Sequence, residues 1–380
     1  MNKELGIYIH IPFCKSKCFY CNFYSEEGQN INIIEKYIDS ICIEIMQNAD
    51  LLSTRKITTV YIGGGTPSLL ETKHIKRILE LLKMFNYEPI EVTIEVNPES
   101  VTEEKLKDYY DLGINRLSFG LQSINEKTLK YIGRSYYSKE NITDIIEKAG
   151  RIGFNNISVD CIIGLPEETE EDFINTVDYI LNLGDNIKHV SAYSLEVHEG
   201  TKIDFLINGG FISLPSEETE RNMKYALDNL LEENGFARYE ISNYAKKGYE
   251  SKHNIKYWNK EEYLGLGAAA SSYINSSRYT NIESVKEYIE GLENNKNIVS
   301  ISEDLEEIDD IKEYIILKLR LKEGLDIKEF KTKFNKDILN MYKEEIDELV
   351  SNNLICINNG NISLTYKGED LANLVWEKFI

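Results

Sequence analysis

The sequence predicts an α/β fold: an open parallel sheet or a partial barrel of six strand–helix units, followed by a small winged-helix-like α+β domain. Short β-branched runs recur through the first half of the chain, and stretches with helical spacing separate them. Near the C-terminus the pattern changes to helices around one hairpin signal. The composition, 42% hydrophobic and 28% charged over 380 residues, is that of a folded globular protein.

The six expected strands are short runs rich in Ile, Val and Thr. They are residues 6–11, 58–63, 91–96, 116–121, 157–163 and 189–195. Helical spacing between them is clearest at 71–85 and 169–182. Strands that alternate with helices favour a parallel sheet with crossover helices, and a closed eight-stranded barrel would need more repeats.

Three regions are expected along the chain. Residues 1–200 hold the repeated units. Residues 201–300 form an extension with a helix at 216–234 and a loop-like aromatic stretch at 244–258. Residues 301–380 form the second domain. In it we expect helices at 307–322, 326–334 and 337–353, a hairpin that turns at Asn359-Gly360, and a last helix.

Charge excludes several partners. A winged-helix-like domain often binds DNA, but residues 301–380 hold 11 Lys and Arg against 18 Asp and Glu. The whole chain has a net charge of −21, so no nucleic-acid partner is expected.

No apolar run approaches the roughly 18–20 residues that span a bilayer, and the first residues do not read as a signal peptide. We expect a cytoplasmic protein without an integral membrane segment.

Three of the six cysteines, Cys14, Cys18 and Cys21, lie within eight residues in the spacing C-x3-C-x2-C. In a reducing compartment such a cluster indicates metal binding more than disulfides. Zinc usually takes four ligands from two pairs, and no second pair has a suitable spacing. Four-iron clusters are normally held by four cysteines, so three would leave one iron open. The scattered Cys42, Cys161 and Cys356 are expected to be small core residues.

Polar and glycine residues follow several of the expected strands. Gly63-Gly64-Gly65 would let the backbone approach a ligand closely, or would simply form a tight turn, and the segment lacks the ending of a P-loop. Glu95, Gln122, Arg134 and Asp160 lie at or near later strands, where barrels of this type collect their active-site residues. The alternative is a structural salt bridge, such as one between Arg134 and Asp160.

The segment CKSKCFYC after YIHIPF, together with GGGTP, resembles the cluster motif of the radical S-adenosylmethionine (SAM) superfamily. The resemblance implies a partial (β/α)6 barrel and a [4Fe–4S] cluster, whose open iron binds the amino and carboxylate groups of SAM. An electron from the cluster can then cleave the sulfonium to a 5′-deoxyadenosyl radical. It also implies SAM contacts at Tyr8, Tyr20, Gly64, Gly65, Thr66, Glu95, Gln122, Arg134 and Asp160. Whether one or two SAM molecules bind stays open.

Over nearly the whole chain, including LKLRLKEGLDI, the motifs resemble the branch of that superfamily that contains HemN and HemW. Phe23 stands where the coproporphyrinogen III dehydrogenase pattern has a fourth cysteine, and the long N-terminal extension of that pattern is missing. Both departures favour the heme-chaperone type, which carries heme as cargo to apo-hemoproteins. The alternatives are the oxygen-independent dehydrogenase or another radical SAM enzyme acting on a tetrapyrrole. A homodimer and a peripheral membrane contact stay open.

His253, Asn254, Tyr257 and Trp258 spell H-N-x-x-Y-W, which resembles the heme-associated signature of the chaperone type. A neutral imidazole can bind heme iron, and Tyr and Trp offer flat apolar faces to a porphyrin. The alternative is that the first two residues staple a loop while the aromatic residues fill a core.

The segment GLGAAA at 265–270 matches a dinucleotide-binding pattern. It follows WNKEEYL, which does not read as a strand, and lies outside any strand–helix–strand unit. We therefore expect no dinucleotide site there.

Overall fold

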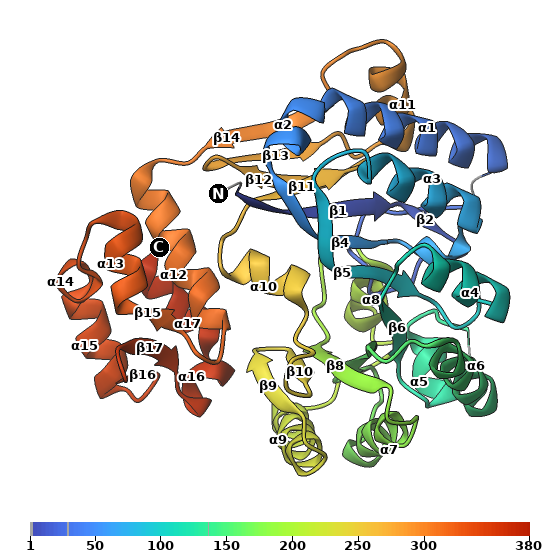
Figure 1. Cartoon of the computed structure of the whole chain (residues 1–380). Helices are drawn as coiled ribbons and strands as arrows, with labels where there is room; N and C mark the ends of the chain where they lie inside the picture. Colours follow the sequence, from blue (N-terminus) through green and yellow to red (C-terminus); the bar gives the residue numbers. More distant parts are fainter. Residues whose placement is uncertain (1–2, 29, 136) are drawn as a thin grey trace.

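The computed structural model describes residues 3–28, 30–135 and 137–380 (Figure 1). Within these residues the main unit is a 12-stranded sheet. Six neighbouring strands run parallel in sequence order: β1 (Glu4–Ile11), β4 (Lys56–Gly64), β5 (Tyr87–Val96), β6 (Arg116–Gln122), β7 (Ile157–Ile163) and β8 (Ile187–Ser194). Each overlaps one of the six expected strands, so the predicted parallel sheet is confirmed.

Helices pack on the outer face of these strands (Figure 1). They are α1 (Ile31–Gln47), α2 (Ala49–Thr54), α3 (Thr72–Leu82), α4 (Glu103–Asp111), α5 (Glu126–Tyr131), α6 (Lys139–Ile152) and α7 (Glu170–Leu181), with a 3-10 turn η1 (Pro67–Leu69). Strand residues such as Ile7, Val60 and Leu117 are fully buried in the main hydrophobic core. Because side chains alternate along a strand, the residues between them face the inside of the curved sheet, and these are largely polar.

Further strands extend both edges of the sheet. On the β1 side lie β11 (Tyr263–Leu266), β12 (Ser271–Ile274), β13 (Ser277–Asn281) and β14 (Val299–Asp304); on the β8 side lie β10 (Asn243–Ala245) and β9 (Ala237–Glu240). The accompanying helices are α8 (Lys202–Asn208), α9 (Glu217–Glu233), α10 (Lys252–Trp258) and α11 (Val285–Glu293). Buried Glu44 of α1 joins these parts, since it accepts hydrogen bonds from Gly267 N (2.8 Å), Asn281 Nδ2 (2.7 Å) and the Tyr288 hydroxyl.

Two expectations for the extension are wrong. The aromatic stretch 244–258 contains helix α10 and strand β10 instead of being a loop. Tyr263–Leu266 is a strand, parallel to β1, although the sequence before GLGAAA did not read as one. The strand is followed by the antiparallel β12 rather than by a helix, so the segment forms no dinucleotide-binding turn.

The C-terminal part has its own hydrophobic cluster. It consists of α12 (Glu307–Arg320), β15 (Leu325–Asp326), α13 (Ile327–Phe334), α14 (Ile338–Met341), α15 (Lys343–Ser351), β16 (Ile355–Asn358), β17 (Asn361–Leu364), α16 (Tyr366–Asp370), α17 (Ala372–Trp376) and η2 (Glu377–Phe379). The hairpin turns at Asn359 and Gly360, both with positive φ, as predicted. The expected helix 337–353 is divided at Tyr342, whose backbone is not helical. The predicted winged-helix-like domain with a small antiparallel sheet is confirmed.

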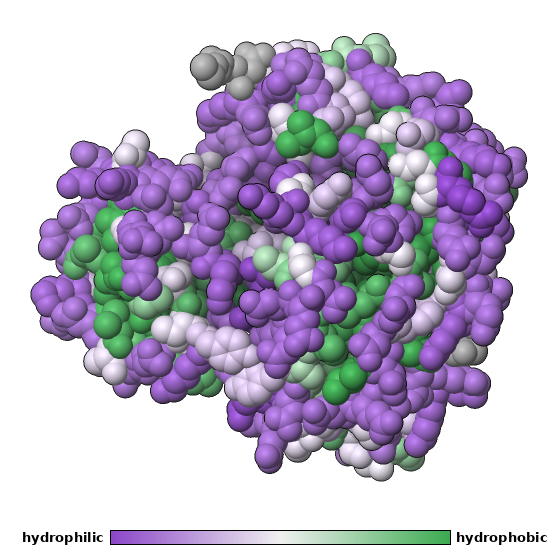
Figure 2. Space-filling model, turned by 60° about the horizontal axis from the view of Figure 1, so that its bottom comes forward, coloured by the Kyte–Doolittle hydropathy of each residue, from purple (hydrophilic) through white to green (hydrophobic). Residues whose placement is uncertain are grey.

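Of the scattered cysteines, Cys161 is buried in β7 as expected, whereas Cys42 and Cys356 are only half-buried. In the described part of the chain no helix is both long and apolar enough to cross a membrane. Figure 2 shows a face that is mostly hydrophilic, with apolar residues in separate small areas.

Candidate functional site

The three clustered cysteines lie in one loop after β1. Cys14 ends the short strand β2 (Phe13–Cys14), which pairs with β3 (Glu26–Glu27), and Cys18 and Cys21 lie between the two. Phe19 N donates to Ile132 O (2.9 Å), which ties the loop to the segment after α5. All three thiols are half-buried and line one cavity, called here the cysteine cavity. Burial raises the pKa of Cys14 and of Cys21.

The arrangement of the three thiols indicates whether they suit a single metal ion or a larger cluster. A zinc ion would hold thiolates about 2.3 Å from one point. Among the described residues, no group of three or more His, Cys, Asp or Glu side chains converges on one ion in this way. Three thiols that border a common cavity without meeting at one point suit a larger cluster better than a single ion.

The glycine turn after β4 packs against the cysteine loop. A Cβ atom on Gly65 would lie 3.0 Å from Cys14 Sγ, and one on Gly64, where φ is +114°, would lie 2.6 Å from the ring of His10. Gly65 N donates to Ile11 O (2.8 Å), and the Thr66 hydroxyl donates to Cys14 Sγ at 3.7 Å. The turn therefore requires glycine for close packing and also exposes backbone to the cavity.

Glu95 is the carboxylate nearest to this turn. It accepts hydrogen bonds from the Tyr61 hydroxyl (2.9 Å) and from Gly64 N (3.0 Å). Burial, and then the nearby Asp160 carboxylate, raise the pKa of Glu95 to about 7. A half-buried carboxylate of this kind favours a cationic ligand, because a positive charge would offset the lost hydration.

Asp160 lies inside the barrel on β7, with the hydroxyls of Ser118 and Ser158 donating to it at 3.3–3.4 Å. Burial raises its pKa. Arg134 donates to Gly120 O at 2.7 Å. Among the described residues, the Arg134 guanidinium bonds Gly120 O and the cation that acts on Asp160 is Arg116, so the salt bridge between Arg134 and Asp160 is not formed.

Gln122 ends β6 with a φ of +68°, at an irregularity where the pairing between β6 and β7 changes register. Its side chain accepts a hydrogen bond from the Tyr193 hydroxyl (3.4 Å). A left-handed backbone at a non-glycine residue is costly and often marks a functional position.

The structure brings most of the expected SAM residues together with the three thiols. Eight of them line the cysteine cavity: Tyr20, Gly64, Gly65, Thr66, Glu95, Gln122, Arg134 and Asp160. The ninth, Tyr8, lines the neighbouring cavity, and its hydroxyl lies 2.9 Å from His10 Nδ1.

That neighbouring cavity, called here the aromatic cavity, has a volume of about 630 Å³, within the range of small-molecule sites. It shares Phe23, Gly64 and Glu95 with the cysteine cavity. All four residues of H-N-x-x-Y-W line it. Its aromatic side chains are Tyr8, Phe23, Tyr24, Tyr61, Tyr257, Trp258, Tyr263 and Tyr273.

His253 is held tightly beside this cavity. Its Nδ1 lies 2.8 Å from the Thr59 hydroxyl and its Nε2 lies 2.7 Å from the Tyr257 hydroxyl. The ring stacks on Tyr61, with centroids 5.3 Å apart. Burial lowers the pKa of His253 to about 3, so the imidazole is neutral at physiological pH. Its role as a heme ligand stays a prediction.

Helix α10, which carries the motif, is fixed from two sides (Figure 1). At its N-terminus the buried Glu91 of β5 accepts hydrogen bonds from Lys252 N (2.9 Å) and His253 N (3.0 Å). At its C-terminus the guanidinium of Arg320 on α12 lies 4.4 Å from the ring centroid of Trp258. The same guanidinium lies 5.5 Å from the ring of Trp376.

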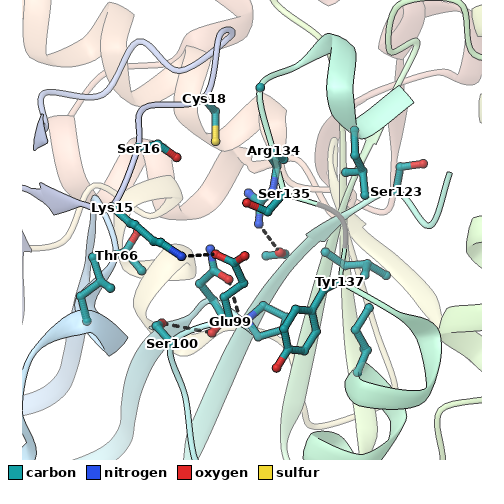
Figure 3. Close-up of a pocket in the computed structure, with 18 residues that line it drawn as sticks. Lys15, Ser16, Cys18, Thr66, Glu99, Ser100, Ser123, Arg134, Ser135 and Tyr137 are labelled. Atoms are coloured by element: carbon teal, nitrogen blue, oxygen red, sulfur yellow. Dashed lines mark hydrogen bonds and ion pairs between the residues drawn. The ribbon is translucent and has the colours of Figure 1, made fainter. Parts of the chain in front are cut away.

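A third cavity lies on the other side of Cys18 and Arg134 (Figure 3). Cys18 and Arg134 line both this cavity and the cysteine cavity. Lys15 and Glu99 form an ion pair of 3.7 Å beside it. Cys18 therefore faces two cavities, this third cavity and the cysteine cavity.

Several residues of the site were not predicted from the sequence. Thr59, Tyr61 and Glu91 contact the motif helix or the Glu95 carboxylate, as described above. Arg116 is buried inside the barrel at the start of β6, and its positive charge opposes the rise in the pKa of Glu95 and of Asp160. Side chains alternate between the two faces of a strand. The alternation within the predicted strands could therefore have assigned these residues to the inner face of the sheet, which also holds Glu95 and Asp160.

Comparison with known proteins gives a consistent result. Residues 8–180 match the family model of the radical SAM superfamily, and residues 305–371 match that of the HemN C-terminal domain. The chain is 36% identical to the heme chaperone HemW of Lactococcus lactis subsp. lactis, over 100% of this chain and 98% of that one. It is 33% identical to the heme chaperone HemW of Bacillus subtilis, over 98% of each chain.

Among solved structures, the fold is similar to that of coproporphyrinogen III oxidase (HemN) from Escherichia coli, which is described as a radical SAM enzyme. The TM-score is 0.87 at 23% identity, over 100% of this chain and 90% of that chain. At this identity the likeness establishes the shared fold.

Proposed function

We propose, on the premise that this chain belongs to the radical SAM superfamily and within it to the family of the heme chaperone HemW, that it binds heme in the aromatic cavity and transfers it to apo-hemoproteins. The observation that carries the proposal is the position of the H-N-x-x-Y-W residues. All four line a cavity rich in aromatic rings that shares a wall with the cysteine cavity. Aromatic rings pack well on the faces of a porphyrin, and the neutral imidazole of His253 supplies an iron ligand.

The same proposal assigns a [4Fe–4S] cluster to Cys14, Cys18 and Cys21, and SAM to the residues beside them in the cysteine cavity. When bound, the cluster supplies one-electron reduction and SAM a source of an organic radical. Glu95 would face the cationic part of SAM, and Gly64 and Gly65 would admit it close to the backbone. Tyr8 would lie between SAM and heme, because it lines the aromatic cavity beside Glu95.

A cluster of three half-buried free cysteines suits a reducing compartment, so we place the protein in the cytoplasm. Asn254, Tyr257 and Trp258 would form part of the cavity wall against heme.

The test uses the full chain, reconstituted anaerobically, and titrates it with heme while the Soret band is followed. We expect a saturable Soret shift for the wild type and its loss in His253→Ala. Transfer is then measured by adding an apo-hemoprotein and following the return of the acceptor's own spectrum. If the wild type binds no heme, or binds it without passing it on, the proposal fails.

Coproporphyrinogen III dehydrogenase is the second candidate, because the fold is that of HemN and the residues expected to contact SAM are present. A parallel reaction with SAM, a strong reductant and coproporphyrinogen III separates the two. Decarboxylated porphyrin, detected by fluorescence after oxidation, would establish the enzyme, whereas its absence alongside heme transfer would support the chaperone.

A further inference from the structure

We infer that Tyr257 blocks the iron-binding atom of His253 in the cargo-free protein and must turn away before heme iron can bind there. The inference rests on the proposed function, because it concerns the same histidine. It adds a role for Tyr257 that differs from lining the cavity: its hydroxyl competes with the iron.

The imidazole ring itself is immobile. His253 N donates to the buried Glu91 carboxylate at 3.0 Å, which fixes the backbone. Nδ1 is held at 2.8 Å by the hydroxyl of Thr59, a fully buried residue of β4. Tyr61 stacks on one face of the ring. Rotation of the ring would break both the Thr59 hydrogen bond and the stacking on Tyr61, which lie on β4, so Nε2 is the atom left for a ligand from the aromatic cavity.

Tyr257 is much less constrained. It lies one residue before the end of α10 and is half-buried in the wall of the aromatic cavity. Within the described residues, Nε2 of His253 is the only hydrogen-bond partner of its hydroxyl. Its ring meets His253 and Tyr263 edge to face, with centroids 5.0 and 4.6 Å apart. Rotation of this side chain would break one hydrogen bond and leave the helix intact.

The contact excludes iron whichever tautomer His253 adopts. If the Tyr257 hydroxyl donates to Nε2, it occupies the lone pair that iron would take. If Nε2 carries the proton, it has no lone pair to offer until the proton moves to Nδ1. In both cases an oxygen atom 2.7 Å from Nε2 occupies the position of the metal.

This competition suits a protein that must both take up and release heme. The hydroxyl stabilises the cargo-free state and returns to Nε2 when the iron leaves. Removing one neutral hydrogen bond from the free state should therefore tighten heme binding by about three- to ten-fold. It should slow transfer to an acceptor by a similar factor, since no competitor for Nε2 remains.

The experiment compares wild type with Tyr257→Phe in the full reconstituted chain, with ferric heme mixed in a stopped-flow instrument and the Soret band recorded. We expect about three- to ten-fold tighter binding in the variant with an unchanged Soret position, because the iron ligand is the same. Transfer to an apo-hemoprotein should be slower. Tyr257→Leu, which also lacks the hydroxyl, serves as a second variant, and far-UV circular dichroism confirms folding.

Tyr225→Phe is the matched control, since it removes the hydroxyl of a half-buried tyrosine that packs on Tyr366 and does not line the aromatic cavity. It should show no such gain. Heme affinity in Tyr257→Phe equal to or below that of wild type, with His253→Ala still defective, would overturn the blocking role and leave the proposed function standing. A normal Soret shift in His253→Ala would instead show that His253 is not the iron ligand. The blocking role of Tyr257 would then fail as well.

Discussion

Burial raises the pKa values of two carboxyl groups, the half-buried Glu95 and the buried Glu44, to about 7 in two different settings. Glu95 faces the cysteine cavity with one side open to a ligand. Glu44 is enclosed by Gly267, Asn281 and Tyr288 and faces no cavity described above. The first is expected to act in ligand binding and the second in stability.

Replacing Glu95 with glutamine should weaken SAM binding about 10- to 100-fold, the range for loss of one charge-assisted hydrogen bond. In the wild type, SAM affinity should rise between about pH 6 and about pH 8, because only the ionised carboxylate attracts the cation and its pKa lies near 7. Calorimetric titration at both pH values measures this. Equal affinity of variant and wild type across that range would rule the role out.

Glu44 should make stability fall as pH rises. Its pKa is raised from an ordinary 4.5 in the unfolded chain to about 7 in the folded one, so its stabilising effect is complete below about pH 4.5 and lost as pH rises through 7. The change amounts to at most about 3.4 kcal/mol. Urea denaturation of wild type and Glu44→Gln at several pH values measures it. The variant should show a smaller slope, and an unchanged slope would refute the assignment.

At the scale of elements, the six parallel strands were predictable because each is a compact β-branched run, and the crossover helices between them follow from helical spacing. Helix α10 was not predictable. It has only seven residues and one local signal, the N-cap Ser251, and the carboxylate that accepts hydrogen bonds from its first two N–H groups, Glu91, lies 161 positions before Lys252 in the sequence. Local signals cannot reveal hydrogen bonds that a distant strand supplies.

Glu91→Ala should destabilise the protein by about 2–4 kcal/mol, since it leaves the buried N–H groups of Lys252 and His253 without an acceptor. Heme binding should weaken as well, because His253 loses its fixed position. Chemical denaturation and the Soret titration measure the two effects. Glu250→Ala is the control, as Glu250 is a partly exposed carboxylate beside the same helix; it should change stability by less than about 1 kcal/mol. Similar losses in both variants would contradict the capping role.

The residues that line the cavities, and their partners, could be predicted only in part, for a related reason. The cysteines, the glycine turn and the polar strand ends could be named because they follow motifs or strands. Thr59 and Tyr61 could not be assigned to His253, because a contact across 194 residues depends on how α10 enters the barrel. The pairing of Arg134 was likewise undecided until the fold placed its guanidinium beside Gly120 O.

At the scale of the whole molecule, one arginine connects the C-terminal domain to the motif helix. Arg320 of α12 lies between the rings of Trp258 and Trp376, and its guanidinium lies 3.8 Å from the buried Glu240 carboxylate. These are the two tryptophans of the chain. Both tryptophans of the chain therefore lie at this contact, and tryptophan fluorescence of the cargo-free protein responds to it.

Arg320→Met should change the tryptophan emission, lower the free energy of unfolding by about 2–4 kcal/mol and weaken heme binding. The free energy of unfolding is expected to fall because the buried Glu240 carboxylate loses the positive charge of the Arg320 guanidinium beside it. Fluorescence spectra, denaturation and the Soret titration measure the three effects. Lys378→Met, at an exposed ion pair with Glu348 in the same domain, is the control and should leave all three unchanged. An unaltered spectrum in Arg320→Met would show that the contact does not persist in solution.

The position of Cys18 between two cavities has a consequence for the order of events. The opening in Figure 3 is separate from the aromatic cavity, whose lining residues do not include Cys18. On the proposed function, a small reductant or chelator could approach the cysteine loop from that side while heme fills the aromatic cavity. Loading with heme and renewal of the proposed cluster would then not have to wait for each other, because each would have its own entrance.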